Sequence, residues 1–455
     1  MKTKLSLLVV VLANAFAFAQ SETCAENLSL MASSVKAKDI TAYDYLAPLR
    51  KDCATSNELI YRYGEFAIKL KIDKAANDSE KEKYVRELLG LFDEHFKNYP
   101  TSSYAKGVEM KKGMALFNYN VGTKEESYKH FDNAFKNDLA NFDDVRGLYA
   151  YFEMFVNDYK AGNKGIELQQ VFDKYDDISE KLAALGKENS DVLDGYLNRL
   201  EANETLSSKE EKNKAKIESN LENIAVITSS MDAIIVDLSS CDKLIPFYQK
   251  GFEENKTNEQ WLKRAADRLE SKECDTDPLF SKISEALYKL NPSAEAAYKL
   301  GVVEVQRKNT TKALEYFNQA ANLFQDNTKK AQVYMRIAAM YKNSSKSQAR
   351  SYARKALAVK PSYGMAHLFI AGLYGSSVNE CGNDQFEKRA VYWLAAREAD
   401  KAAAVDASVK AKAQSMAAQY RAAAPSKTDI FTAGRAGQRI AFNCWIGESI
   451  VVPNL

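Results

Sequence analysis

The chain carries an internal repeat between Ala294 and Gly375, and this repeat limits the possible folds more than any other feature. Each copy sets small residues and aromatic residues at matching places. The first copy has Leu300-Gly301, Ala313, Phe317 and Ala320; the second has Ile337-Ala338, Tyr341, Ala349, Ala353, Ala356 and Pro361; the third has Ile370-Ala371 and Tyr374. The copies are spaced about 33 to 37 residues apart, a period typical of stacked helical units. The alternative is an ordinary helical bundle with coincidental spacing.

The order of residue types resembles the tetratricopeptide repeat (TPR), and in particular exported TPR proteins of Gram-negative bacteria. The resemblance implies two antiparallel helices in each unit. Gly301, Ala338 and Ala371 would lie where these helices cross, since a larger side chain would push them apart. We therefore expect an all-α chain, a TPR or TPR-like helical-repeat solenoid with a small C-terminal β element.

The rest of the chain follows the repeat pattern more loosely, although Ser127, Phe131 and Ala134 keep its spacing. From Ile430 the sequence alternates and is rich in β-branched and aromatic residues, which predicts short strands. The expected segments are 1–19, a signal peptide; 20–203, degenerate TPR-like repeats; 204–291, a long helix and helical hairpins; 292–425, TPR repeats and a helical cap; and 426–455, a β-hairpin tail.

The N-terminus has the features of an export signal. Lys2 and Lys4 precede an apolar run, and Ala17-Phe18-Ala19 matches a cleavage site before Gln20. The run is short for a membrane span, and no other long apolar run exists in the sequence. These two lysines account for the net charge of +2, so the remaining chain offers no argument for nucleic acid or an anionic membrane as a partner. We expect an exported protein, periplasmic or associated with the outer membrane.

Six cysteines fit disulfides in an exported chain, although composition alone allows 15 connectivities. The helical pattern narrows the choice, because the two ends of an antiparallel helical hairpin lie side by side. This predicts the pairs Cys24–Cys53 and Cys241–Cys274, which leaves Cys381–Cys444. Six buried free thiols are the alternative. Since the sequence has no CxxC motif, a zinc or redox site has little support.

An apolar stripe marks residues 207–240, where Ile217, Leu221, Ile224, Met231, Ile235 and Leu238 recur at spacings of three and four, with Thr228 filling the gap. This predicts a helix of about 30 residues with one apolar face. The stripe either packs on neighbouring helices of the same chain or forms a dimerising coiled coil. We expect the first, and hence a monomer.

Catalytic motifs are absent from the sequence. It contains no HExxH, GxSxG, P-loop or GxGxxG pattern. Its three histidines, His95, His130 and His367, lie at helical positions that suit packing or surface roles. We therefore expect no enzyme, no metal and no cofactor.

The resemblance implies a protein-interaction scaffold of the cell envelope, which holds a protein or peptide partner in a groove lined by the first helix of each unit. The family's contact positions, mapped onto this chain, include Glu295 and Gln332. The remaining mapped positions form a largely apolar groove of Tyr298, Val302, Val305, Met335, Ala339, Lys342, Met365 and Leu368. Such a groove suits an amphipathic helix. The tail or the long helix of the chain itself is the alternative occupant. The rival function is binding of envelope polysaccharide or cell wall through the C-terminal β element, which an exposed aromatic row on the tail would favour.

Overall fold

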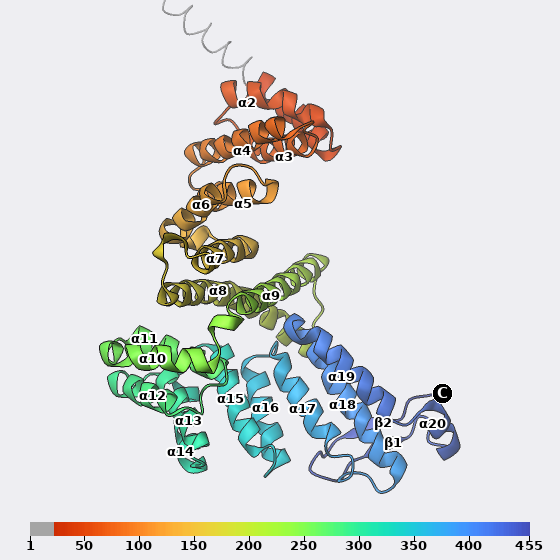
Figure 1. The fold of residues 1–455 in the computed structure, drawn as a ribbon. Coiled ribbons are helices and arrows are strands. Elements are labelled where there is room, and N and C mark those ends of the chain that lie inside the picture. The colour runs from red at the N-terminus through yellow and green to blue at the C-terminus, as the bar shows by residue number, and fades with distance from the viewer. Residues whose placement is uncertain (1–21) are drawn as a thin grey trace, which may run out of the picture. The chain divides into compact units, whose positions relative to one another are not determined.

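The computed structural model describes residues 22–455. The signal peptide expected at residues 1–19 lies outside them. Over the described residues the chain is built from helices, and a single two-stranded sheet lies near the C-terminus (Figure 1). The expected fold class is confirmed: successive helices pack as antiparallel pairs, and the β element is small.

The chain divides into two compact units, Met1–Ile178 and Ser179–Leu455, and the boundary falls within one long helix, α8 (Leu168–Glu201). The division into five segments expected from the sequence stays a prediction.

The first unit is an array of helices in which α3 packs against α4 and α5 packs against α6. Its elements are a helix over residues 22–36, a 3-10 helix at Ile40–Tyr45, α2 (Leu46–Asp52), α3 (Leu59–Asp73), α4 (Asp78–Asn98), α5 (Val108–Tyr119), α6 (Lys124–Asn137), α7 (Val145–Lys160) and the start of α8, with 3-10 turns at Leu139–Asn141 and Asn163–Gly165. Gly113 of α5 faces Phe131 of α6 so closely that an added Cβ would lie 2.7 Å from the ring. A small residue therefore lets the two helices approach, as in a repeat unit.

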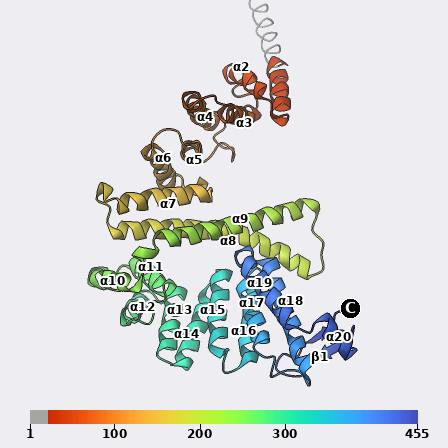
Figure 2. The same cartoon turned by 45° about the vertical axis from the view of Figure 1, so that its right-hand side comes forward.

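The second unit contains the clear repeats, and α13–α14, α15–α16 and α17–α18 each form a closely packed pair (Figures 1 and 2). Its elements after α8 are α9 (Ser208–Ile234), α10 (Cys241–Asn255), α11 (Glu259–Ser271), α12 (Pro278–Leu290), α13 (Ala294–Gln306), α14 (Thr310–Leu323), α15 (Asn327–Tyr341), α16 (Lys346–Val359), α17 (Gly364–Gly375), α18 (Gln385–Val405), α19 (Lys410–Ala423) and α20 (Lys427–Ala433), with 3-10 turns at Val236–Leu238 and Ala407–Val409.

The small residues of the repeat lie at helix crossings, as predicted. A Cβ on Gly301 of α13 would lie 2.5 Å from the ring of Phe317 of α14. Ala338 and Ala371 are fully buried. Because no larger side chain fits at such contacts, the pattern of small residues sets how closely the paired helices pack.

Polar side chains cap the N-termini of the four helices α13 to α16, where the first backbone N–H groups lack partners within the helix. Each accepts a hydrogen bond from an N–H of the first turn: Ser293 at α13, Asn309 at α14, Asp326 at α15 and Ser345 at α16. These caps fix where each helix begins.

The apolar stripe of residues 217–238 packs within the chain. In α9 and the turn after it, Ile217, Met231 and Ile235 are buried, and Leu221 is half-buried. The helix runs antiparallel to the end of α8, to which it is tied by the Arg199–Glu210 ion pair of 2.6 Å. It ends at Ile234, earlier than expected, and a 3-10 turn follows.

The tail differs in part from its prediction. Strands β1 (Arg439–Ala441) and β2 (Ser449–Val451) pair antiparallel, with Ile440 opposite Ile450. However, the strand expected from Ile430 is wrong, because residues 427–433 form the helix α20. Ser426 and Asp429 make a reciprocal capping box that starts this helix.

All six cysteines are paired, and the three predicted pairs are confirmed. The Cα–Cα distances are 5.9 Å for Cys24–Cys53, 5.5 Å for Cys241–Cys274 and 5.5 Å for Cys381–Cys444. The third disulfide joins the tail to the loop between α17 and α18, which is longer than the repeat pattern allows.

Candidate functional site

The candidate site is a cavity of about 530 Å³ on the face formed by the first helices of successive pairs in the second unit. Helices α11, α13 and α15 supply most of its lining, and residues at the ends of α14 and α17 complete it. The lining residues are Lys263, Asp267, Glu270, Ser271, Glu295, Tyr298, Lys299, Phe324, Lys329, Gln332, Met335, Arg336 and Tyr363. Its size lies in the range of sites that take a small ligand or a few side chains.

The repeat places equivalent residues around this cavity. Tyr298 and Lys299 of α13 occupy the same repeat positions as Met335 and Arg336 of α15, and all four line it. The first turn of α13 is fixed by the Ser293 cap, so Tyr298 and Lys299 follow one turn later on the cavity side.

A carboxylate ties three helices together at the floor of the cavity. Glu270 of α11 lies 2.6 Å from the Lys299 ammonium group and 2.6 Å from the Arg336 guanidinium group. Tyr298 donates a hydrogen bond of 2.8 Å to the same carboxylate and accepts one of 3.1 Å from Arg336 Nε. Lys299 is almost fully buried and also pairs with Asp267 at 2.5 Å.

These contacts keep the floor ionised. Burial raises the pKa of Glu270, but Lys299 and Arg336 outweigh burial and hold the pKa below its usual value. Burial lowers the pKa of Lys299, but Asp267 and Glu270 outweigh it and raise the pKa overall. Burial and then the Glu270 charge raise the pKa of Tyr298 to about 12. Near neutral pH the floor therefore consists of charges that neutralise one another, a network suited to holding helices in place.

The wall of the cavity carries fewer charged side chains than its floor. Lys329 pairs with Glu295 at 2.6 Å. Gln332 is exposed, and Met335 is half-buried beside it. Phe324 and Tyr363 add aromatic surface. This wall offers an amide, a thioether and two rings, which are groups that bind peptide side chains through hydrogen bonds and apolar contact.

The predicted groove residues divide into three groups. Tyr298 and Met335 line the cavity. Val302 and Leu368 are buried in this structure, and Leu368 packs against alanines of α18 and α19. Their contact with a partner stays a prediction.

The remaining four, Val305, Ala339, Lys342 and Met365, are exposed but do not line the cavity. Whether they contact a partner stays a prediction. Because Val302 and Leu368 do not line the cavity, its lining is mixed in polarity, whereas a largely apolar groove was expected.

The charged residues at the floor of the cavity were not predicted from the sequence. Lys299 and Arg336 stand at the same repeat position, 37 residues apart (336 − 299), and a cation repeated inside an apolar helix pattern was the available signal. Glu270 lies upstream of the clear repeats, so its part in the network follows only from the packing of α11 against α13.

The tail gives the rival function little support. Phe442 is buried, and Trp445 packs on Tyr374 with its Nε1 donating to Ser377 Oγ at 3.1 Å. Only Phe431, on α20, is well exposed among the aromatic residues of the tail, at 73%. The tail therefore presents no aromatic row.

Between residues 22 and 455, no helix is both long and apolar enough to cross a bilayer. The same residues contain no cluster of three or more His, Cys, Asp or Glu side chains placed to hold a metal ion.

The similarity of this chain to known proteins is weak. No protein-family model matches the chain, and no curated protein matches it. Among solved structures, yeast Tom70 is similar over 91% of this chain and 98% of its own, with 10% identity and a TM-score of 0.24. A circular tandem repeat protein with novel repeat topology is similar over 92% of this chain and 99% of its own, with 10% identity and a TM-score of 0.23. We draw nothing about function from scores this low.

Proposed function

We propose that the chain is a non-enzymatic scaffold that holds a segment of a partner protein in the cavity between α11, α13 and α15. The observation that carries the proposal is the arrangement of this cavity. It is open, it spans three helical layers, and its floor is held rigid by the Glu270 network. A rigid site loses little conformational freedom when a partner binds.

The chemistry of the cavity also bears on what would bind there. Because the floor charges are paired with one another, a highly charged ligand would have to break buried ion pairs, which is costly. The wall formed by Gln332, Met335 and the two aromatic residues favours a peptide segment with apolar and hydrogen-bonding side chains. The pKa shifts of Glu270 and Lys299 both favour their ionised forms, which suits groups that hold the helices together.

We further propose that the protein is exported, periplasmic or associated with the outer membrane. Three disulfides support an oxidising compartment. We also propose a monomer, since the apolar stripe of α9 is largely covered by the chain's own helices. Light scattering of the purified protein should then give the mass of one chain, and a dimer would contradict this.

Site-specific photo-crosslinking tests the partner site. A photoreactive amino acid replaces Gln332 on the cavity wall, and in a control chain it replaces Asn318, an exposed residue with the same side-chain amide on α14. In extracts of the producing cells, the first chain should crosslink to a defined protein and the control should not. Equal products from both positions would refute the cavity as the binding site.

A further inference from the structure

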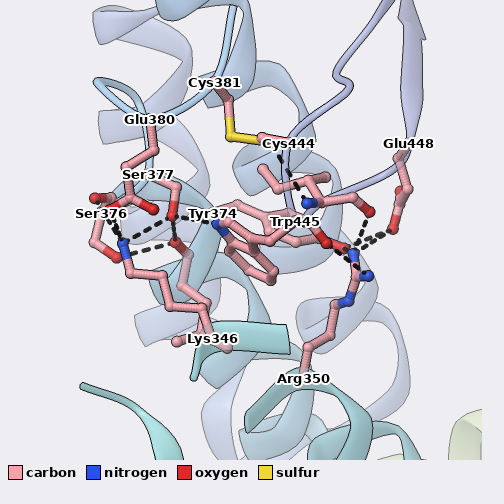
Figure 3. Close-up of a disulfide and its surroundings, with 12 residues drawn as sticks. Lys346, Arg350, Tyr374, Ser376, Ser377, Glu380, Cys381, Cys444, Trp445 and Glu448 are labelled. Atoms are coloured by element: carbon pink, nitrogen blue, oxygen red, sulfur yellow. Dashed lines mark hydrogen bonds and ion pairs between the residues drawn. A yellow bond between two sulfur atoms is a disulfide. The ribbon is translucent and has the colours of Figure 1, made fainter. Parts of the chain in front are cut away.

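The tail lies across α16, α17 and α18 of the second unit, and Figure 3 shows how it is held there. Trp445 packs on the ring of Tyr374, with a centroid separation of 5.8 Å, and the Arg350 guanidinium group lies 5.2 Å from the Trp445 ring. The indole N–H donates to Ser377 Oγ at 3.1 Å. One aromatic side chain of the tail is therefore recognised on its face and at its polar edge.

The same arginine binds the backbone of the tail. Arg350 donates hydrogen bonds to the carbonyl oxygens of Ile446, at 2.5 Å, and of Trp445, at 3.2 Å. Contacts to main-chain carbonyls do not depend on the side chains that follow, so any peptide in this conformation could make them.

Three residues beyond Trp445, a carboxylate enters a cluster of arginines. Glu448 accepts hydrogen bonds from Arg354 at 2.8 Å and from Arg397 at 2.6 Å, and Arg350 lies 3.7 Å away. The Tyr374 hydroxyl donates to it at 2.6 Å. The three arginines belong to α16 and α18, so the repeats supply the positive charge and the tail supplies the single carboxylate. Without Glu448 this surface would hold three close cations, an arrangement that attracts an anion.

The arginine cluster is also accessible from one side. A cavity of about 640 Å³ in the second unit is lined by Arg354 and Glu448 together with His367, Leu357 and other residues of α8, α16, α17 and α18. A competing carboxylate could approach Glu448 through this cavity. Gly447 precedes Glu448 and has a φ of +60°, a conformation that glycine adopts readily, and nothing lies within 4 Å of where a Cβ would be.

From these contacts we propose that the surface of α16, α17 and α18 is a second peptide-binding site, and that Trp445–Glu448 is its built-in ligand. The peptide class it takes has an aromatic residue followed three residues later by a carboxylate. The tail keeps the site closed until a partner segment of this class displaces it. This inference does not rest on the cavity between α11, α13 and α15, which shares no lining residue with the arginine cluster.

The tail is anchored on both sides of this stretch, so release of Trp445 and Glu448 need not detach it. The Cys381–Cys444 disulfide holds the residue before Trp445, and Val452 is buried beyond Glu448. Anchored ends keep the built-in ligand at a high effective concentration, which a competing segment must overcome.

Peptide binding to the full chain tests the proposal. The opened variant carries Trp445→Ala and Glu448→Ala and keeps the disulfide, and Val451→Ala, at an exposed residue of the same hairpin, is the control. The probe is a fluorescent peptide of residues 442–452 with Cys444→Ser. The opened variant should bind it saturably and at least tenfold more tightly than the wild-type and control chains. A Glu448→Gln change in the peptide should weaken binding about tenfold or more, because charge-assisted bonds are lost. Equal binding by all chains, or no binding to a folded opened variant, would overturn the proposal.

Hydrogen exchange of the wild-type chain gives a second test that needs no variant to fold. If Trp445–Glu448 is a displaceable ligand, the amide of Gly447, which is bonded to the Cys444 carbonyl at 3.1 Å, should exchange through local opening. Its opening free energy should be lower than that of amides within α17. If the Gly447 amide and the amides of α17 have the same opening free energy, the tail opens only together with the core and the proposal fails.

Discussion

Gly301 lies against the ring of Phe317 so closely that a Cβ on Gly301 would be 2.5 Å from Cδ1 of that ring. The two residues belong to the two helices of one repeat unit, α13 and α14. Their contact sets how closely the helices pack, and α13 in turn carries Tyr298 and Lys299 to the cavity. Gly301 therefore both allows close helix packing and helps to position the residues of the candidate site.

Replacing Gly301 by alanine should destabilise the second unit by about 1 to 3 kcal/mol, because the added methyl group overpacks the crossing. The matched control is Gly195→Ala in α8, where nothing lies within 4 Å of the added Cβ. That change should stabilise by up to about 1 kcal/mol, since alanine favours a helix over glycine. Urea unfolding followed by circular dichroism measures both. Similar effects of the two substitutions would show that the crossing is not tightly packed.

Lys299→Met should destabilise the second unit by about 3 kcal/mol. The substitution removes the buried cation that pairs with both Asp267 and Glu270, and it leaves the two carboxylates without this partner. The control is Lys329→Met, which breaks a more exposed pair with Glu295 and should cost less than about 1 kcal/mol. Thermal unfolding of both variants is the measurement. Equal losses would mean that the floor network does not hold the helices together.

Acid should weaken the packing of α17 against α18 through Glu398. Burial raises the pKa of this carboxyl group, but His367 and Lys401 outweigh burial and hold the pKa at about 2, below the ordinary value of 4.5. Because the folded pKa is the lower one, the ionised carboxylate stabilises the fold above pH of about 4.5, and this contribution is lost as the pH falls towards 2.

The free energy of unfolding of wild type should therefore exceed that of Glu398→Gln by an amount that shrinks between these pH values. Urea titrations at a series of pH values measure the difference. A difference that stays constant down to pH of about 2 would contradict the assigned pKa.

The disulfides should be present in the purified protein. Alkylation without reduction should label no thiol, and peptide mapping should recover the pairs Cys24–Cys53, Cys241–Cys274 and Cys381–Cys444. Replacing both Cys24 and Cys53 by alanine should destabilise the first unit by about 4 kcal/mol in the chain-entropy model. Labelling of all six thiols in the unreduced protein would exclude these bonds.

The parts of the fold that could be predicted from sequence depend on local pattern. Small residues at a repeat spacing mark helix crossings wherever they occur, so Gly301 and Ala338 identified the repeats without knowledge of their neighbours. The pairs Cys24–Cys53 and Cys241–Cys274 followed from the helical hairpin pattern, since hairpin ends are adjacent whatever the helices pack on, and Cys381–Cys444 followed by elimination. Helix α20 was missed because alternating apolar residues suggested a strand, although Ser426 and Asp429 already had the spacing of a capping box.

The candidate site was only partly predictable, because it depends on which helices meet. Tyr298 and Met335 were found from their repeat positions. The role of Glu270 needs α11 to pack near α13 and α15, which no local pattern shows. The burial of Val302 and Leu368 could not be predicted, because an apolar residue at a helix position looks the same in sequence whether it faces a groove or a neighbouring helix.

Selection of peptides on the cavity tests the central claim most directly. A random peptide library displayed on phage is selected against the full chain, and the affinities of the selected peptides are then measured on two variants. Met335→Glu puts a charge on the cavity wall, and Asn318→Glu puts the same charge on an exposed part of α14. If the cavity holds partner segments, Met335→Glu should weaken binding at least tenfold while Asn318→Glu leaves it unchanged. A selection in which no peptide loses affinity for Met335→Glu would contradict the claim.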